Sequence, residues 1–291
     1  MKDLYAQYNC DLNDAEVKKA VAEILAKNFA KNNTVEVYKK CFNLIDLTSL
    51  NSTDTEDQIG TMMQKVNDFS EHYPEMPNVA AVCVYPSLVP VTRAVLEKEN
   101  GVNIAAVAAC FPSSQSFIEV KVAETALTVQ AGADEIDVVI SIGKFFSGFH
   151  SEVYEELQEL KAACGKAHLK VILESGALRS AVEIKQASLL AIAAGADFIK
   201  TSTGKMEPAA TLEAAYIMCG AIKEYYEKTG VKIGFKPAGG VATTEDAVKF
   251  YTVVNTVLGE EWMNNKLFRF GASRLSNNLL TSIYNKEIKY F

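Results

Sequence analysis

The sequence predicts an α/β protein folded as a (β/α)8 barrel, and three observations lead to this fold class. Short apolar, β-branched runs recur along the chain, and each is followed by an amphipathic segment of helical length. Such nearly continuous apolar runs are typical of parallel strands that are buried on both faces. There are eight of them at even spacing, and 291 residues is a usual length for a barrel that forms one domain.

A helical N-terminal extension precedes the strand candidates. In residues 1–40, Asn13 stands where a helix cap is expected, and apolar residues after it recur at helical spacing. Two later helices end in the same Ala-Gly-Ala-Asp sequence, with Gly132 and Gly195 at the position of a helix C-terminal glycine. In chain order, strands are expected at residues 42–46, 79–85, 104–109, 135–140, 169–174, 198–201, 232–236 and 268–272.

An open, doubly wound sheet is the alternative arrangement of eight parallel strands. The even spacing favours the closed barrel, and no Gly-x-Gly-x-x-Gly motif follows the first strand candidate, which argues against a dinucleotide-binding fold. Because we find no linker or low-complexity stretch, we expect a single domain over residues 1–291. It would consist of the extension at 1–40, the barrel at 42–280 and a C-terminal tail at 281–291.

The composition narrows the class of partner and the compartment. A net charge of −7 and a pI near 5.2 argue against a general affinity for nucleic acid or an anionic membrane, although local cations could still hold one phosphate. The six cysteines form no Cys-x-x-Cys pair, as is usual for reduced residues of a cytosolic protein. We see neither a signal peptide nor an apolar run of membrane-spanning length, so we expect a cytoplasmic protein.

Two lysines stand at the ends of neighbouring strand candidates, where the polar residues of a barrel meet at one open mouth. Lys200 and Lys236 each follow an aromatic and apolar stretch. A buried lysine is costly to keep charged and a second one nearby adds repulsion, so one of the pair should lose its proton at neutral pH. A free amine is what a Schiff-base nucleophile requires. The simpler alternative is that each lysine reaches water or pairs with Asp137 or Glu174.

The loops after the last three strand candidates favour a phosphate ligand. Residues 200–205 supply hydroxyls, a glycine and a cation, 236–241 supply paired glycines, and 271–274 supply a glycine, a serine and an arginine. Glycine lets backbone N–H groups approach a phosphate, and a following helix N-terminus adds a favourable dipole. The usual phosphate site of phosphosugar barrels is formed by loops in these positions. The sequence therefore favours a phosphorylated sugar as substrate.

A metal site has little support in the sequence. The three histidines, His72, His150 and His168, lie far apart, and no metal-binding spacing of histidine or cysteine occurs. We therefore expect neither a metal nor another cofactor. Cys83 ends a strand candidate and could line the pocket, but a small buried hydrophobic residue is the more common role of such a cysteine.

At these positions the sequence resembles the deoxyribose-phosphate aldolase family. Residues 197–205 (Asp-Phe-Ile-Lys-Thr-Ser-Thr-Gly-Lys) and 234–240 (Gly-Phe-Lys-Pro-Ala-Gly-Gly) are similar to the two lysine motifs of that family. The resemblance extends over about residues 42–280 and implies a class I, Schiff-base aldolase on a barrel fold. Supporting matches are found at residues 46–50, 81–86, 132–139 and 270–273.

The resemblance also implies a reaction and a set of site residues. The family cleaves 2-deoxy-D-ribose 5-phosphate reversibly to D-glyceraldehyde 3-phosphate and acetaldehyde, in deoxyribonucleotide catabolism, without a cofactor. By this resemblance Lys200 forms the Schiff base and Lys236 lowers its pKa, while Asp137, helped by Asp46, orders a water for proton transfer. The substrate and its phosphate would be held by Cys83, Thr203, Gly204, Lys205, Gly239, Gly240, Gly271 and Ser273.

Three positions need separate comment. Ala242 occupies a position where bacterial members often carry an arginine, and Arg274 one where a second serine is common. A cation has moved from one phosphate loop to another, which leaves the phosphate preference open. A C-terminal tyrosine can reach the active site in this family, so Tyr290 is a candidate for proton transfer, although a frayed terminus or an interface contact is the simpler interpretation.

Three alternative functions are compatible with the sequence. Another Schiff-base aldolase or a transaldolase would act on a different phosphosugar. A phosphosugar isomerase would use an acid/base pair such as Glu174 and a histidine, and a non-catalytic barrel would only bind the phosphosugar. As partners we expect a small phosphosugar and, for the assembly, a homo-oligomer with a dimer favoured, but neither nucleic acid nor membrane.

Overall fold

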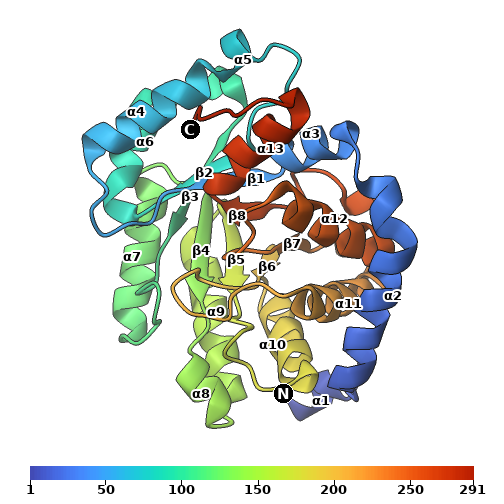
Figure 1. The fold of residues 1–291 in the computed structure, drawn as a ribbon. Helices are drawn as coiled ribbons and strands as arrows, with labels where there is room; N and C mark the ends of the chain where they lie inside the picture. The colour runs from blue at the N-terminus through green and yellow to red at the C-terminus, as the bar shows by residue number, and fades with distance from the viewer.

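The structure is a computed structural model that describes residues 1–291, and it confirms the (β/α)8 barrel. Eight parallel strands pair in the order β7-β6-β5-β4-β3-β2-β1-β8 (Figure 1). The strands are β1 (Ile45–Thr48), β2 (Ala81–Val84), β3 (Asn103–Val107), β4 (Glu135–Val139), β5 (His168–Ile172), β6 (Phe198–Lys200), β7 (Gly234–Lys236) and β8 (Phe270–Ala272).

The barrel closes between β7 and β8. Two isolated parallel bridges, Phe235–Phe268 and Ala238–Gly271, join these strands and the residues beside them. The Phe235 N–H donates a hydrogen bond to the Leu267 carbonyl oxygen at 2.9 Å. Because the sheet is closed, the loops that follow β6, β7 and β8 meet at one end of the barrel.

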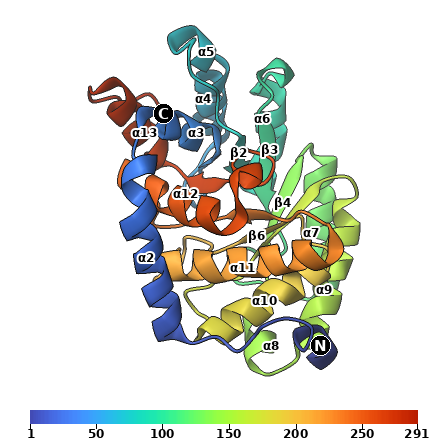
Figure 2. The ribbon, with the colours of Figure 1, turned by 90° about the vertical axis from the view of Figure 1, so that its right-hand side faces the viewer.

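Helices form a layer around the strands, as Figures 1 and 2 show. Most connect one strand to the next parallel strand, which is the right-handed crossover that such a barrel requires. Their bounds are α1 (Lys2–Tyr5), α2 (Asp14–Asn32), α3 (Val35–Asn43), α4 (Glu56–Asn67), α5 (Phe69–His72), η1 (Pro86–Leu88), α6 (Val89–Val95), η2 (Lys98–Asn100), α7 (Ile118–Gln130), α8 (Ile142–Phe146), α9 (His150–Cys164), α10 (Ala181–Ala193), α11 (Leu212–Thr229), α12 (Thr244–Leu258), η3 (Glu260–Trp262) and α13 (Arg274–Tyr284).

The extension of residues 1–40 is helical and lies along the outside of the barrel. The Asn13 side chain caps α2 by accepting hydrogen bonds from two backbone N–H groups of its first turn. Helix α2 packs against α11 and α12 (Figure 2). The buried Asn32 side chain donates to Thr252 Oγ1 at 3.0 Å, which ties the end of α2 to α12. The extension therefore covers the outer face of two barrel helices.

The predicted strands all occur, but four of them begin later than expected. The prediction of a strand from residue 42 is wrong at its start, because α3 continues through Asn43 and β1 begins at Ile45. Phe42 belongs to that helix and is buried against Phe69, with ring centroids 4.9 Å apart. Similarly, β2, β7 and β8 each begin two residues later than predicted, at 81, 234 and 270. A short apolar run looks the same at a buried helix end and in a strand, so periodicity alone cannot place such boundaries.

The interior of the barrel has an apolar side and a charged side. A cluster of 71 buried hydrophobic residues fills the space between strands and helices. A separate small cluster lies inside the barrel near β1 to β3, and the rest of the interior, from β4 round to β1, carries buried charged residues. The small cluster consists of Leu50, Ala81, Cys83, Ala105 and Val107.

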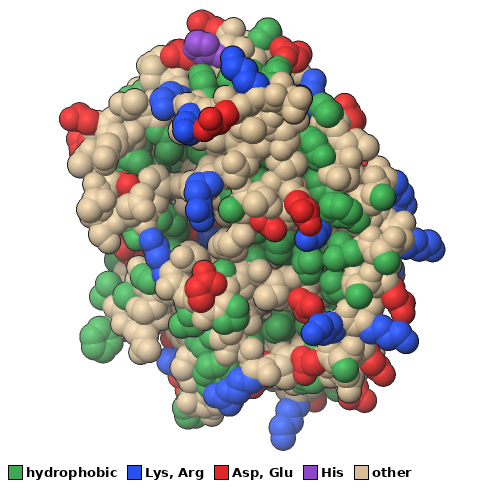
Figure 3. Space-filling model, in the orientation of Figure 1, with side chains coloured by type: hydrophobic (Ala, Val, Ile, Leu, Met, Phe, Trp, Pro, Cys, Tyr) green, Lys and Arg blue, Asp and Glu red, His purple; other side chains and the backbone are tan.

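The surface carries both signs of charge. On the face drawn in Figure 3, acidic and basic side chains are interspersed, and no broad basic area appears on that face. None of the helices combines the length and the apolar composition that a bilayer-spanning helix needs.

Candidate active site

Seven charged side chains lie together inside the barrel, and none is more than 4% exposed. They come from β1, β4, β5, β6 and β7 and from the residue that precedes β8 by one position. Residues two apart on a strand face the same side, which points both carboxylates of β4 into the barrel. The cluster consists of Asp46, Glu135, Asp137, Lys170, Lys200, Lys236 and Arg269.

Asp137 is the centre of this cluster because three lysines contact it. Its Oδ2 atom lies 2.7 Å from Lys200 Nζ and 2.8 Å from Lys236 Nζ. Its Oδ1 atom lies 3.0 Å from Lys170 Nζ. The structure thus brings together Lys200, Lys236 and Asp137, the three residues on which the predicted chemistry depends.

The deeper part of the cluster holds Lys236 and Lys170 more firmly than Lys200. Asp46 Oδ2 lies 2.5 Å from Lys236 Nζ, and Asp46 Oδ1 lies 2.6 Å from Arg269 Nη1. Lys170 forms ion pairs with Glu135 and Asp137. Lys236 and Lys170 therefore each contact at least two carboxylates, whereas Asp137 is the only acidic partner of Lys200.

The electrostatics of the cluster favour a neutral Lys200. Four cations face three carboxylates, so full ionisation would leave one uncompensated positive charge in the interior. Burial lowers the pKa of Lys200, Asp137 opposes this effect and Lys236 adds to it. Burial would also lower the pKa of Lys236, but Asp137 and Asp46 outweigh it and raise that pKa above its ordinary value. Lys200 is thus the lysine that loses its proton most readily.

Lys200 is also the one member of the cluster that reaches the cavity at the barrel mouth. This cavity has a volume of about 290 Å³ and is lined by 17 residues at the ends of β1, β6 and β8, in the loops that follow β1, β6, β7 and β8, and at the start of α13. Lys236 and Asp137 lie behind Lys200 and do not line it. A ligand in the cavity can therefore contact the Lys200 amine. The other charged side chains of the cluster lie deeper in the barrel and influence the pKa of that amine.

The cavity wall beyond Lys200 is built for an anion. Lys205 and Arg274 line it, and no carboxylate does. At Gly239, where φ is +77°, the loop after β7 passes so close to the loop after β6 that a Cβ atom would lie 3.1 Å from Gly204 Cα. All the residues that the family resemblance assigns to substrate binding, except Cys83, line this cavity: Thr203, Gly204, Lys205, Gly239, Gly240, Gly271 and Ser273.

Glu174 organises the loop that carries Lys205. It follows β5 in a left-handed conformation with φ of 51° and is only 3% exposed. Its carboxylate accepts hydrogen bonds from the Thr203 N–H at 3.1 Å and from the Thr203 hydroxyl at 2.6 Å. Thr203 Oγ1 in turn accepts from the Lys205 N–H at 3.0 Å. Both oxygens of Glu174 are therefore engaged in holding a loop.

Two of the candidate residues lie outside the cavity. Cys83 is fully buried in the small apolar cluster, and burial raises the pKa of its thiol. Tyr290 lies beside α4 and α5, where its hydroxyl donates to the Lys65 carbonyl oxygen at 2.8 Å. Neither side chain lines the cavity at Lys200.

Three residues of the cluster, Lys170, Glu135 and Arg269, were not singled out from the sequence. Each is a charged residue within an apolar run that predicts a strand. Because side chains two positions apart on a strand point to the same face, each of these residues can point into the barrel together with another inward-facing residue of its run. Glu135 stands two positions before Asp137, for example. In strands that are buried on both faces this alternation is easily overlooked, because the apolar residues show no polar–apolar pattern.

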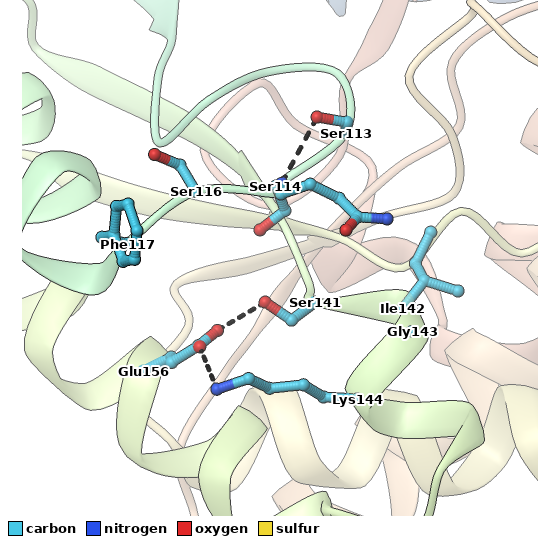
Figure 4. A pocket seen from close by; sticks show the side chains of 10 residues that line it. Ser113, Ser114, Ser116, Phe117, Ser141, Ile142, Gly143, Lys144 and Glu156 are labelled. Atoms are coloured by element: carbon cyan, nitrogen blue, oxygen red, sulfur yellow. Dashed lines mark hydrogen bonds and ion pairs between the residues drawn. The ribbon is translucent and has the colours of Figure 1, made fainter.

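A second cavity of about 330 Å³ lies between the β3–α7 loop and the start of α8 (Figure 4). The Ser141 hydroxyl donates to Glu156 at 2.5 Å, and Lys144 pairs with Glu156 at 2.8 Å. The buried Lys121 also contacts Glu156, at 3.3 Å. These charged groups pair with one another, so neither lysine offers a free amine to this cavity. No group of three or more His, Cys, Asp or Glu side chains in the structure is arranged to hold a metal ion.

The known proteins that this chain matches include several aldolases. Residues 41–261 match a family model described as DeoC/LacD family aldolase. The deoxyribose-phosphate aldolase of Homo sapiens is 37% identical over 94% of this chain and 89% of its own length, and that of Bos taurus is 39% identical over 84% and 80%. Among solved structures, the aldolase QR15 matches with a TM-score of 0.69 and 28% identity, over 84% of this chain and 98% of its own.

Proposed function

The chain belongs to the DeoC/LacD family of aldolases, and from this premise we propose that it cleaves 2-deoxy-D-ribose 5-phosphate to D-glyceraldehyde 3-phosphate and acetaldehyde. The observation that carries this proposal is the position of Lys200, which is the one amine that both belongs to the charged cluster and reaches the cavity. The reaction is reversible and needs no cofactor, and it belongs to deoxyribonucleotide catabolism.

The first step is imine formation on Lys200. The neutral amine adds to the C1 carbonyl carbon of the open-chain sugar, and loss of water from the carbinolamine leaves a protonated imine. Burial of Lys200 and the nearby charge of Lys236 lower the pKa of the amine and keep it nucleophilic. Asp137, 2.7 Å from Lys200 Nζ, is positioned to stabilise the positive charge that develops on the imine.

The second step breaks the bond between C2 and C3 of the sugar. A water held by Asp137 and Lys236, with help from Asp46, takes the proton of the 3-hydroxyl group and passes a proton on to the Asp137 carboxylate, which returns it later when the enamine is protonated. The electrons of the C2–C3 bond move into the imine, so that D-glyceraldehyde 3-phosphate leaves and an enamine remains on Lys200. Protonation of the enamine at C2 and hydrolysis of the imine then release acetaldehyde and restore the amine.

The phosphate anchors the substrate at the other end of the cavity. Gly204, Gly239, Gly240 and Ser273 offer backbone N–H groups there, and Thr203, Lys205 and Gly271 complete the wall. Anchoring by a group remote from the reacting carbon supplies orientation for the reaction. Cys83, buried behind this wall, contributes to the shape of the site from the apolar side of the barrel.

Trapping of the imine tests this proposal. The protein is incubated with acetaldehyde, reduced with borohydride and digested, and the modified peptide is identified by mass spectrometry. We expect the reduced adduct on Lys200 and none in the Lys200→Leu variant. An adduct on Lys236 would exchange the two lysine roles, and a folded protein without any adduct would overturn the mechanism. An imine with dihydroxyacetone phosphate but not with acetaldehyde would indicate another class of aldolase.

An isomerase is less well supported than an aldolase. The acid/base candidate for that reaction, Glu174, has both carboxylate oxygens engaged by Thr203 and does not line the cavity. An isomerase would also retain its turnover in the Lys200→Leu variant, which gives a direct comparison between the two reactions.

We also propose a cytoplasmic homo-oligomer, with a dimer favoured. All six cysteines are unpaired, which is usual in a reducing compartment. Phe117, Val120 and Leu127 on and beside α7 are 79%, 53% and 63% exposed, and a partner subunit would cover such apolar side chains. Light scattering tests the assembly, since a dimer has twice the chain mass of 31.8 kDa; a species at the chain mass itself would contradict it.

A further inference from the structure

We propose that the Arg274 side chain binds the phosphate of the substrate and makes this enzyme selective for phosphorylated aldehydes. This inference rests on the proposed function. The inference goes beyond the proposed function because it assigns the main charged contact with the phosphate to Arg274 rather than to Lys205. Arg274 stands at a position where the family commonly has a serine.

The two cations of the cavity wall differ in their present contacts. Lys205 Nζ donates a hydrogen bond to the Leu50 carbonyl oxygen, so part of its hydrogen-bonding capacity is used within the protein. Arg274 makes no side-chain hydrogen bond and no ion pair in the structure, although it lines the same cavity. An unpartnered guanidinium at the wall of a cavity without carboxylates is available to a ligand.

The surroundings of Arg274 indicate the chemical class of that ligand. Arg274 is the first residue of α13, and the preceding Ser273 makes no capping hydrogen bond, so the first N–H groups of this 11-residue helix lack a side-chain acceptor. Gly239 and Gly240, with φ of 77° and 78°, line the same cavity beside β8. A planar guanidinium beside free backbone N–H groups matches the several oxygens of a phosphate monoester dianion.

Arg274 also explains how the site works without an arginine at position 242. Ala242 and Arg274 line the same cavity. The positive charge that Ala242 cannot provide to this cavity can therefore come from the Arg274 side chain. The guanidinium offers paired donors, whereas a lysine at this place would act as a point charge. The consequence is selectivity for the phosphate dianion over a neutral hydroxymethyl group.

The test compares two substrates in four proteins: the wild type, Arg274→Ser, Arg274→Lys and the control Lys266→Ser. Lys266 is exposed and lies before β8, at the opposite end of that strand from Arg274, so its replacement removes one positive charge away from the cavity. For Arg274→Ser we expect kcat/KM with 2-deoxyribose 5-phosphate to fall about 10- to 100-fold, mainly through KM. With unphosphorylated 2-deoxyribose we expect a change of less than about threefold. Arg274→Lys should be intermediate and Lys266→Ser unchanged.

Binding of inorganic phosphate, measured by calorimetry on the same proteins, separates this inference from the proposed function. A weaker phosphate affinity in Arg274→Ser alone supports the inference even if the wild type cleaves neither sugar, an outcome that would refute only the aldolase assignment. Equal losses of activity with both substrates, or unchanged phosphate affinity in Arg274→Ser, would overturn the role of Arg274.

Discussion

The ε-amino groups of Lys200 and Lys236 meet at a single carboxylate oxygen, Asp137 Oδ2, at 2.7 Å and 2.8 Å. The two lysines are otherwise held differently, because Lys236 has Asp46 as a second acidic partner and Lys200 does not. Their environments therefore move their pKa values in opposite directions, down for Lys200 and up for Lys236. Two residues of the same type thereby acquire two roles, a nucleophile and a fixed charge.

Replacement of Lys200 by leucine should abolish turnover, because the leucine side chain cannot form an imine. We expect kcat to fall by about 10⁴-fold or more, as is usual when a covalent nucleophile is removed. Lys166→Leu, at an exposed position after α9, is the matched control and should keep wild-type activity. The measurement is cleavage of 2-deoxyribose 5-phosphate with coupled detection of the aldehyde. Turnover within tenfold of the wild type in Lys200→Leu would exclude this lysine as the nucleophile.

The pH dependence of imine formation should change when Lys236 is replaced by leucine. The substitution removes a positive neighbour that lowers the pKa of Lys200, and it leaves Asp137, which raises that pKa, with fewer competing cations. The pKa of Lys200 should therefore rise. Because the amine reacts only when neutral, the acidic limb of the rate profile should move to higher pH, with about a tenfold loss of free amine for each pH unit of the shift.

The rate of borohydride trapping with acetaldehyde, measured across pH on Lys236→Leu, checks this prediction without requiring full turnover. Circular dichroism on the same samples establishes that the variant is folded. An acidic limb at the wild-type position in a folded Lys236→Leu variant would show that Lys236 does not control the amine. The wild-type profile itself should fall towards acid, since protonation of Lys200 removes the nucleophile.

The sequence is sufficient to predict the strand order and the two lysines, but not the full charged cluster. Lys200 and Lys236 end their strands next to glycine-containing loops. Such a motif consists of residues that are adjacent in the chain, so it can be recognised in the sequence. Arg269 meets Glu135, and Lys170 meets Asp46, across the interior of the barrel, from strands that are not neighbours in the sheet. Such contacts join residues more than a hundred positions apart in several cases, so local patterns contain no signal for them.

Arg269, a residue of the charged cluster that was not singled out from the sequence, should contribute strongly to the stability of the fold. Its guanidinium lies 2.6 Å from Asp46 Oδ1 and 2.9 Å from Glu135 Oε1, with all three side chains buried. Arg269→Met would leave both carboxylates short of positive charge and should lower the free energy of unfolding by about 3–5 kcal/mol. Arg93→Met, which breaks a partly exposed pair with Asp134, should cost clearly less.

Urea unfolding at several pH values measures how much each variant loses in free energy of unfolding and how that loss changes with pH. The surrounding cations lower the pKa of Glu135 to about 2, against the effect of burial. A lowered carboxyl pKa gives stability that is present above the ordinary pKa near 4.5 and is lost as the pH falls towards 2. The deficit of Arg269→Met should therefore be complete at pH 7 and shrink in acid. A deficit that is constant from pH 7 to acid would contradict the ionic origin of the effect.

Glu174 should act as a positioning residue for the loop of Thr203 and Lys205. Glu174→Gln keeps the size of the side chain but replaces one acceptor oxygen by an NH2 group, which cannot accept from Thr203. We expect KM for 2-deoxyribose 5-phosphate to rise about 5- to 20-fold with little change in kcat, in line with the loss of one charge-assisted hydrogen bond.

A double-mutant cycle with Thr203→Val tests the coupling between these two residues. If Glu174 works through Thr203, the double variant should be no worse than the poorer single variant. Additive losses, or a fall of kcat with both phosphorylated and unphosphorylated 2-deoxyribose, would show that Glu174 acts on the chemistry by another route.

The C-terminal tail should stabilise the fold without taking part in proton transfer. The Asn277 side chain holds the tail by accepting from the Tyr290 and Phe291 N–H groups at 2.9 Å and 3.0 Å. The Tyr290 ring packs against Phe69 at a centroid distance of 5.6 Å, and its hydroxyl is bonded to the Lys65 carbonyl oxygen. A side chain fixed in this way does not reach Lys200, so Tyr290→Phe should retain wild-type kcat and lose about 1 kcal/mol of stability with its hydrogen bond.

Deletion of residues 286–291 extends the same argument, because it uncovers the aromatic rings of α3 and α5 that the tail packs against. We expect a lower Tm for this truncation but an unchanged rate per folded molecule, and Asn277→Ala should show a milder form of the same result. Thermal unfolding and steady-state kinetics on the three variants check both parts. A tenfold or larger fall of kcat in Tyr290→Phe would mean that the tail leaves its position beside α5 during turnover and that its hydroxyl serves at Lys200 after all.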